Sequence, residues 1–135
     1  MKIAAITDDG ATISQHFGRA RNYMVLTVAG GEITNREMRP KAGHHDFAHE
    51  GGHDHEHGEG KHAHGFGEGA AHRHEAMISA ITDCDVVLVR GMGRGAYMAL
   101  QEAKIEAIVT DIADIEQAAQ AYLDGSIVNH LDRLH

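Results

Sequence analysis

The first forty or so residues alternate between short apolar runs and turn signals, which is the pattern of β-strands. Residues 2–7, KIAAIT, form an apolar run that is closed by the turn signal DDG. Residues 23–28, YMVLTV, are rich in β-favouring side chains and lead into a pair of glycines that suits a tight hairpin. Residues 32–38, EITNREM, place polar residues between the apolar ones. This spacing predicts an exposed third strand that stops at Pro40, because proline cannot donate to a sheet ladder.

From His72 onward, the apolar residues take the wider spacing of helices, interrupted by short buried runs. Five segments alternate there between helix and strand: 75–82, 84–90, 93–104, 106–110 and 114–125. The last helix ends at Gly125, a residue type that commonly terminates helices. The complete order, βββαβαβα, predicts an α/β fold in which one mixed five-stranded sheet carries helices on its faces. We expect a single domain that spans residues 1–135.

Residues 43–71 separate these two halves and show neither period. They carry eight glycines and six acidic residues, with almost no apolar side chains. We therefore predict a flexible loop that is inserted between the third strand and the first helix. Closing this loop costs about 2 kcal/mol more than closing a short turn, at ~0.6 kcal/mol for each doubling of length. A structureless loop of this length is usually functional or disordered.

Ten of the 13 histidines lie in or beside this loop: His44, His45, His49, His53, His55, His57, His62, His64, His72 and His74. Imidazoles on a flexible chain can surround a divalent ion such as Zn²⁺, Ni²⁺ or Cu²⁺. The alternatives are a solvated spacer and an expression tag, but a tag is usually a pure histidine run at a terminus. The stretch HEGGH, residues 49–53, has the spacing of a zinc protease motif, but its two glycines disfavour the helix that this motif requires.

Net charge and cysteine content restrict the classes of partner. The formal net charge of −8 at pH 7 argues against binding to nucleic acid. The apolar runs are too short to cross a membrane, and the first residues lack the pattern of a signal peptide. A single cysteine cannot form an internal disulfide, so we expect a reducing, cytoplasmic environment. We expect a monomer or a weak homodimer.

Both flanks of the loop resemble a known family. In MKIAAITDDGATISQHFGRARNYMVLTV, a strand and a short loop lead to the step His16-Phe17-Gly18, which Arg19 follows. This step, together with the later segment ITDCDVVLVRGMGRGAYMALQEAKIEAIVT, is similar to the nitrogenase iron–molybdenum cofactor biosynthesis family. That family includes NifX-like and NafY-like carriers, the C-terminal domain of NifB-like proteins and orange-protein relatives. The histidine-rich loop departs from the family pattern.

The resemblance implies a ribonuclease-H-like three-layer fold and a non-catalytic protein that binds or carries a metal–sulfur cluster. The cluster would be an iron–sulfur or a molybdenum-containing cluster, handled during the assembly or delivery of a metallocofactor. The resemblance also implies His16 as a ligand of this cluster, and a cluster-assembly enzyme or a recipient apoprotein as the partner. The alternative function is a histidine-rich protein that buffers or delivers divalent metal ions such as zinc, nickel or copper.

The residues around His16 also suit metal binding when they are considered without the resemblance. A neutral imidazole on a loop is a good ligand for borderline metals. Gly18 allows a bulky ligand to approach the backbone, and Arg19 and Arg21 can face an anionic cluster. The same residues also fit a loop histidine that bonds a neighbouring carbonyl. Both interpretations stay open from the residues alone.

A second candidate is the stretch RGMGRGAYM, residues 90–98, whose glycines stand between a strand and a helix N-terminus with free N–H groups. Its G-x-G-x-G spacing differs from the dinucleotide-binding fingerprint, and a tight strand–helix turn is the plain alternative. Ligands of such sheets bind at the carboxyl ends of strands. We therefore expect a cluster site with two walls: Met92, Gly93 and Arg94 in this turn, and His16, Phe17, Gly18 and Arg19 in the first loop.

Three further alternatives concern other parts of the chain. Cys84 begins a buried strand, where a small apolar filler is expected and a cluster thiolate is the alternative. Asp8 and Asp9 follow one strand, whereas Asp83 and Asp85 precede another, so their carboxylates are not expected to converge on a two-metal nuclease site. The glycine-rich turn also leaves open an adaptor that binds a nucleotide.

Overall fold

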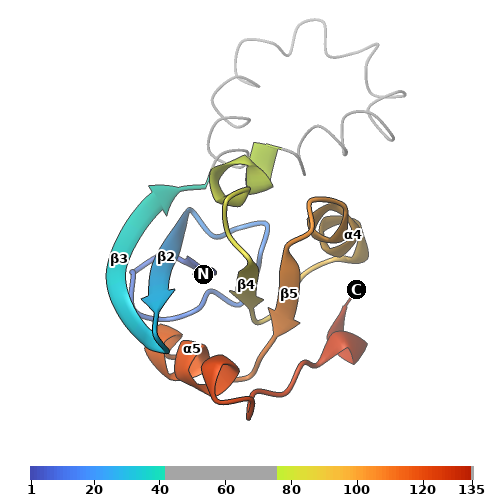
Figure 1. Ribbon diagram of the computed structural model, residues 1–135. Helices are drawn as coiled ribbons and strands as arrows, with labels where there is room; N and C mark the ends of the chain where they lie inside the picture. The colour runs from blue at the N-terminus through green and yellow to red at the C-terminus, as the bar shows by residue number, and fades with distance from the viewer. Residues whose placement is uncertain (42–75, 135) are drawn as a thin grey trace, which may run out of the picture.

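A single mixed β-sheet organises the computed structural model, which describes residues 1–41 and 76–134 (Figure 1). The strands are β1 (Lys2–Thr7), β2 (Asn22–Ala29), β3 (Glu32–Pro40), β4 (Val86–Val89) and β5 (Glu106–Val109). The other elements are the helices α4 (Arg94–Glu102) and α5 (Ile115–Leu123) and the 3-10 turns η3 (Ser79–Ile81) and η4 (Leu131–Arg133).

The strands lie in the order β3-β2-β1-β4-β5, so the first strand of the chain is the central one. β1 pairs antiparallel with β2, and β2 pairs antiparallel with β3. On the other side, β1 pairs parallel with β4, and β4 pairs parallel with β5. This arrangement confirms the mixed five-stranded α/β sheet that the sequence predicts.

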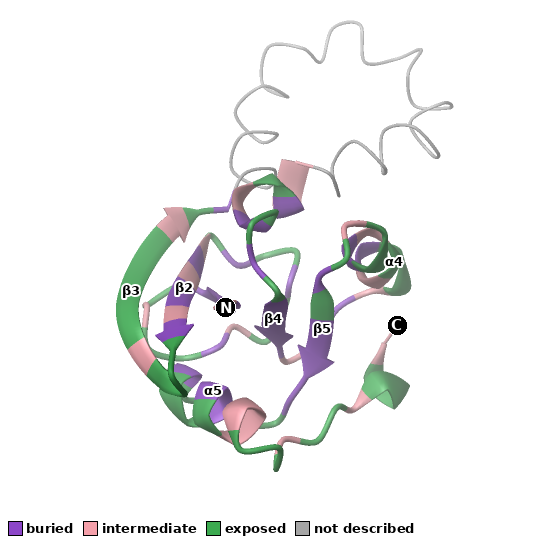
Figure 2. Cartoon of the chain, viewed as in Figure 1, coloured by how far each residue is buried: buried purple, intermediate pink, exposed green. Residues whose placement is uncertain are grey.

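Burial falls from the middle of the sheet to the β3 edge. Every residue of β4 is buried, whereas β3 is mostly exposed (Figure 2). Parallel strands that are covered on both faces have continuous apolar sequences, which explains VVLV in β4. Pro40 is the last residue of β3 and lies on an edge strand, where a missing N–H is tolerated. The predicted exposed third strand is therefore confirmed, with Pro40 inside it.

Residues of β2 point alternately to the two faces of the sheet. The hydroxyl of Tyr23 donates to the carbonyl of Met77 at 2.6 Å, so the helical residues 76–78 and η3 cover that face. Leu26 points the other way and lines a cleft with Ile115 at the start of α5. Figure 1 shows α5 and the segment 76–81 on opposite sides of the sheet. The sheet thus forms the middle layer between helical segments.

The helices that flank β4 and β5 have ends that follow from their sequences. The carboxylate of Asp114 accepts the N–H of Gln117 at 2.9 Å and so caps α5, and Gly125 beyond its end has φ +81°. The predicted end of this helix is therefore confirmed. The helix predicted over 75–82 is described only as residues 76–78 followed by η3, because the chain turns there toward β4.

Two further expectations concern membrane-spanning helices and the histidine-rich loop. No helix in the described parts of the chain is long and apolar enough to cross a membrane. The loop predicted at 43–71 lies outside the described residues, and so do its ten histidines.

Candidate functional site

Each of the five strands has one of its ends at the same edge of the sheet, and the candidate residues lie in the segments next to these ends. Thr7, the last residue of β1, lies opposite Asn22 of β2, and Asn22 lies opposite Pro40 of β3. Because β4 and β5 run parallel to β1, their carboxyl ends reach the same edge. We call it the carboxyl edge. The chain leaves β1 toward one side of the sheet and β4 toward the other, and such a switch point is where open α/β sheets bind ligands.

At this edge, the loop that contains His16 is held directly against the glycine-rich turn after β4. The backbone N–H of Phe17 donates to the carbonyl of Gly91 at 3.1 Å. A Cβ atom added to Gly91 would lie 3.0 Å from the carbonyl oxygen of Gln15, which is closer than ordinary packing allows. Gly91 therefore lets the two loops approach this closely without a shift of the backbone at Gln15, and the two loops lie at one edge, as the sequence predicts.

His16 occupies the exposed tip of its loop. Its carbonyl accepts the N–H groups of Arg19 and Ala20 at 3.2 and 3.1 Å, which forms a tight turn. Its backbone N–H and the hydroxyl of Ser14 are 3.4 Å apart. No hydrogen bond within residues 1–41 and 76–134 involves the imidazole of His16. The ring is exposed and available to a ligand, in contrast to a loop histidine that bonds a neighbouring carbonyl.

Phe17 and Met92, one from each predicted wall, are buried rather than open to a ligand. Their exposed fractions are 3% and 2%, so their side chains anchor the two loops in the core. The ring of Phe17 packs against that of Tyr23, with centroids 6.5 Å apart. At these two positions only the backbone can face a bound molecule.

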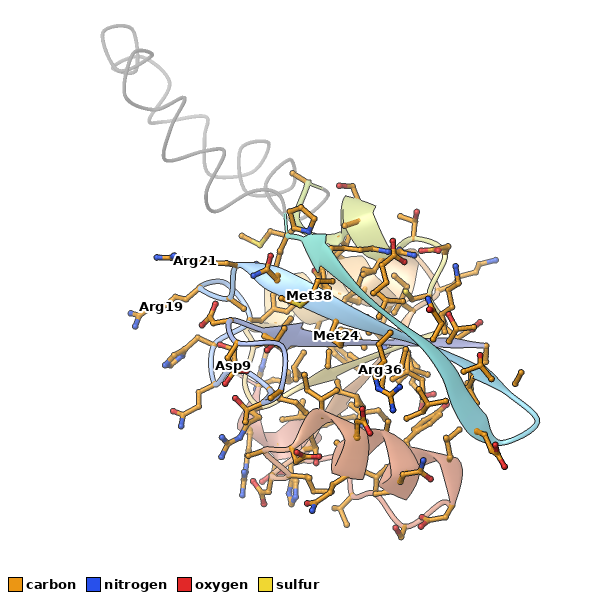
Figure 3. The ribbon with its side chains drawn as sticks, turned by 90° about the vertical axis from the view of Figure 1, so that its left-hand side faces the viewer. Asp9, Arg19, Arg21, Met24, Arg36 and Met38 are labelled. Carbon is orange, nitrogen blue, oxygen red and sulfur yellow. The ribbon has the colours of Figure 1, made fainter. Side chains whose placement is uncertain are left out.

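Gly18, Arg19 and Arg94 are exposed. A Cβ atom on Gly18 would meet nothing within 4 Å, so the space beside its backbone is open. Figure 3 shows Arg19 and Arg21 extending into solvent from the loop between β1 and β2. Arg94 begins α4, where a positive charge opposes the helix dipole, and Gly93 before it provides no side-chain cap. These groups give the edge positive charge and free donors.

Asp9 shapes the same loop rather than serving as a free carboxylate. It accepts the N–H groups of Ala11 and Thr12, both at 2.8 Å, and the hydroxyl of Thr12 at 2.9 Å. These hydrogen bonds, led by the one from the N–H of Thr12, hold the pKa of Asp9 well below its usual value. The oxygens of Asp9 therefore already have hydrogen-bonding partners within this loop.

Lys41 is a site residue that the sequence analysis does not identify. It directly follows β3 and is only 2% exposed, and its ammonium nitrogen lies 4.8 Å from the centroid of the Phe17 ring. Burial lowers the pKa of Lys41 to about 8, and nearby Asp8 partly opposes this change. No pattern in the sequence signals this position, since a lysine after an exposed edge strand is normally in solvent.

The remaining candidates lie at the opposite end of the sheet. Cys84 is buried before β4, and its pKa is raised to about 11, chiefly by burial. Asp83 and Asp85 bond Lys2 at the start of β1, far along the strand from Asp8. Cys84 is thus a buried filler away from His16, and these carboxylates do not converge with Asp8. In the described ranges, no group of three His, Cys, Asp or Glu side chains is placed to hold a metal ion.

The fold and the edge site define an α/β protein with an exposed histidine at the switch point of its sheet. The family described as dinitrogenase iron–molybdenum cofactor matches residues 1–125. This match covers most of the chain, so the protein belongs to that family, as its resemblance implies.

Individual relatives are more distant. An uncharacterized protein of Methanocaldococcus jannaschii is 23% identical over 127 residues, which cover 94% of this chain and 89% of that protein. The apo form of the orange protein from Desulfovibrio gigas has a similar structure, with a TM-score of 0.62 and 20% identity over 96% of this chain and 92% of its own. The crystal structure of PH0822 has a TM-score of 0.66 and 18% identity, with 98% of each chain covered. At these identities, the two structures show that the fold is shared.

Proposed function

We propose that this protein is a non-catalytic carrier of a metal–sulfur cluster, either an iron–sulfur or a molybdenum-containing cluster, in the assembly or delivery of a metallocofactor. Membership of the cofactor family supports this role. The observation that carries it is the exposed imidazole of His16, which has no hydrogen bond to another described residue and sits on a loop fixed against the Gly91 turn. His16 is the terminal ligand of the cluster.

The geometry suits a cargo that is held and then released. The imidazole of His16 provides one coordinating bond, and the one cysteine of the chain, Cys84, lies at the other end of the sheet. The cluster must therefore bring its own sulfide or other ligands. Arg19 and Arg94 offset its negative charge, and the open space beside Gly18 admits its bulk. Binding through a single protein ligand favours transfer of the cluster over its permanent retention.

The same proposal includes the partners of the protein, its cellular location and the name of its fold. The partners are a cluster-assembly enzyme that loads the site and a recipient apoprotein that unloads it. The buried free thiol of Cys84 suits a reducing cytoplasm, where thiols stay unpaired. The strand order β3-β2-β1-β4-β5 supports the ribonuclease-H-like name for the fold.

The proposal is tested by loading the protein anaerobically with ferrous iron and sulfide, and separately with tetrathiomolybdate. Cluster content is measured by metal analysis and visible absorbance in wild type, His16→Ala and the neighbouring control Gln15→Ala. The side chain of Gln15 is exposed, and only its backbone approaches Gly91, so this control keeps the loop intact. We expect His16→Ala to lose most of the cluster and Gln15→Ala to retain it. Equal loading of His16→Ala and wild type would show that His16 is not the ligand.

The alternative function is divalent-metal binding by the histidine-rich loop, which depends on residues outside the described part of the chain. The two functions predict different results for a chain that lacks residues 44–70. A cluster carrier keeps the His16 site in that chain and loads as the full protein does. A metal buffer would lose its binding.

A further inference from the structure

Lys41 is a buried cation without a hydrogen-bonding partner. Its side chain is 2% exposed, and its ammonium nitrogen forms no hydrogen bond with any residue in the described ranges. An ammonium group carries three donors, and leaving buried donors unsatisfied is unfavourable by about 1–3 kcal/mol. A methionine of similar length would fill the same space without this cost. The position of Lys41 is therefore not explained by packing.

The surroundings of Lys41 connect it to the His16 loop on two sides. Its backbone N–H donates to the carbonyl of Arg21 at 2.8 Å, which fastens the end of β3 to the end of that loop. Its ammonium faces the ring of Phe17, the residue next to His16, at 4.8 Å from the centroid. A cation near an aromatic face gains some electrostatic energy, but the ring accepts no ordinary hydrogen bond. The ammonium thus lies directly behind the proposed ligand loop with its donors unused.

The nearby charges leave this region positive. Asp8 is the carboxylate whose charge acts on Lys41, and it already accepts the backbone N–H of Arg21 at 2.9 Å. Lys41, Arg19 and Arg21 together exceed the two negative charges of Asp8 and Asp9, and the oxygens of Asp9 are already bonded to Ala11 and Thr12. An anion that comes to the loop would meet both the excess positive charge and the unused donors. Sulfide and oxo groups bound to a metal are anionic hydrogen-bond acceptors of this kind.

We propose that Lys41 binds the negative charge of the cargo, with its ammonium donating hydrogen bonds to the sulfide or oxo ligands of an anionic metal–sulfur species at His16. The four-carbon stem lets the ammonium shift from behind Phe17 toward the loop when such an acceptor arrives. The anion then supplies the partners that the empty protein lacks. This inference rests on the proposed function, because it takes the His16 loop as the place where the cargo is held.

The experiment measures the affinity for tetrathiomolybdate at pH 7.5, by visible absorbance and by titration calorimetry. Lys41→Met removes the charge and keeps the length, whereas Lys41→Arg keeps the charge and the donors. Lys104→Met is the matched control, since it removes one positive charge from an exposed site at the end of α4. We expect Lys41→Met to weaken binding at least tenfold, and Lys41→Arg and Lys104→Met to stay within about threefold of wild type.

The outcomes separate this inference from the proposed function. Weaker binding by His16→Ala with unchanged binding by Lys41→Met would overturn the role of Lys41 alone. Weaker binding by Lys41→Met with unchanged binding by His16→Ala would support Lys41 and remove His16 as the ligand. No binding by wild type would overturn both. An equal loss in Lys104→Met would show a general charge effect and count against Lys41. Lys41→Gln repeats the test with a polar neutral side chain if Lys41→Met does not fold.

Discussion

Charged side chains near the start of β4 differ from His16 and Lys41 at the carboxyl edge in whether they have partners within the protein. At the end where β1 and β4 begin, the ammonium of Lys2 lies 3.0 Å from a carboxylate oxygen of Asp83. The guanidinium of Arg39 lies 2.7 Å from the other oxygen of the same carboxylate. At the carboxyl edge, Asp111 after β5 is also paired, with His130 and Arg133, but His16 and Lys41 have no such partner among the described residues.

In the proposed function, this difference separates charges that hold the fold from charges that a bound cluster would pair. Paired groups at the first end satisfy one another and need no external molecule. The buried, unpaired ammonium of Lys41 lowers the stability of the empty protein, whereas the exposed ring of His16 is hydrated. In the proposed function, a bound anion supplies the missing partners of Lys41. We therefore expect substitutions at the two ends to separate stability from cluster loading.

The largest expected effect comes from Gly91, where the carboxyl edge is most tightly packed. Gly91→Val places a branched side chain against the carbonyl of Gln15, where even a Cβ atom would lie at 3.0 Å. Overpacking of this kind typically costs about 1–3 kcal/mol, so we expect the free energy of unfolding in urea to fall by about 2 kcal/mol. Cluster loading should fall as well, because the two loops are forced apart. Unchanged urea stability would show that the loops do not need this close contact.

Lys41→Met should stabilise the empty protein by about 1 kcal/mol below pH 8, because it removes an unsatisfied buried donor. The pKa of Lys41 is about 8 in the folded protein against an ordinary value of 10.5. Between these values the unfolded chain binds more protons, so wild-type stability should rise with pH relative to the variant. The advantage of the variant should therefore shrink from pH 8 to pH 10.5. Urea denaturation across this range gives both curves, and a constant difference would mean that Lys41 is not the titrating group.

Asp83→Asn tests the paired end and should cost about 1 kcal/mol of stability, because its ion pairs are partly exposed and screened. Arg39, and then Lys2, hold the pKa of Asp83 well below its usual value of 3.8. The stabilisation is therefore complete above that value and is lost as the pH falls below it. Wild type and variant should converge in thermal melts as the pH is lowered. Cluster loading should be unaffected, and a loss as large as that of His16→Ala would contradict the division between the ends.

Gly18→Ala should have the smallest effect on stability, within about 0.5 kcal/mol, since its Cβ atom would meet nothing within 4 Å and its φ is not positive. It should nevertheless reduce cluster loading if a bulky cargo approaches this backbone. Loading is measured as for His16→Ala, with Gln15→Ala again as the control. Full loading of Gly18→Ala would show that the cargo lies elsewhere on the loop.

The arrangement of the sheet was predictable because it depends on local patterns and general rules. The two-residue period, the hairpin glycines and the alternation of helix and strand predict the elements and one mixed sheet, whereas the pairing of β1 with β4 comes from the structure. The meeting of the His16 loop with the Gly91 turn follows in the same way, because both come after the carboxyl ends of neighbouring strands.

The parts that were not predictable depend on contacts between distant residues. The sequence does not show that Phe17 and Met92 face the core, because each sits in a loop with polar or glycine neighbours. Burial of Lys41 arises only when the ring of Phe17 covers it from another segment. Similarly, Asp9 resembles a free carboxylate until the turn around Thr12 bonds both of its oxygens.

The central claim is that His16 itself coordinates the cluster. Pulsed electron paramagnetic resonance on the reduced, iron–sulfur-loaded protein detects a nitrogen that is bound to the cluster, and ¹⁵N-labelled histidine identifies its source. We predict a histidine nitrogen coupling in wild type and in the chain that lacks residues 44–70, and its absence in His16→Ala. A coupling that persists in His16→Ala, or that disappears when residues 44–70 are removed, would contradict the assignment.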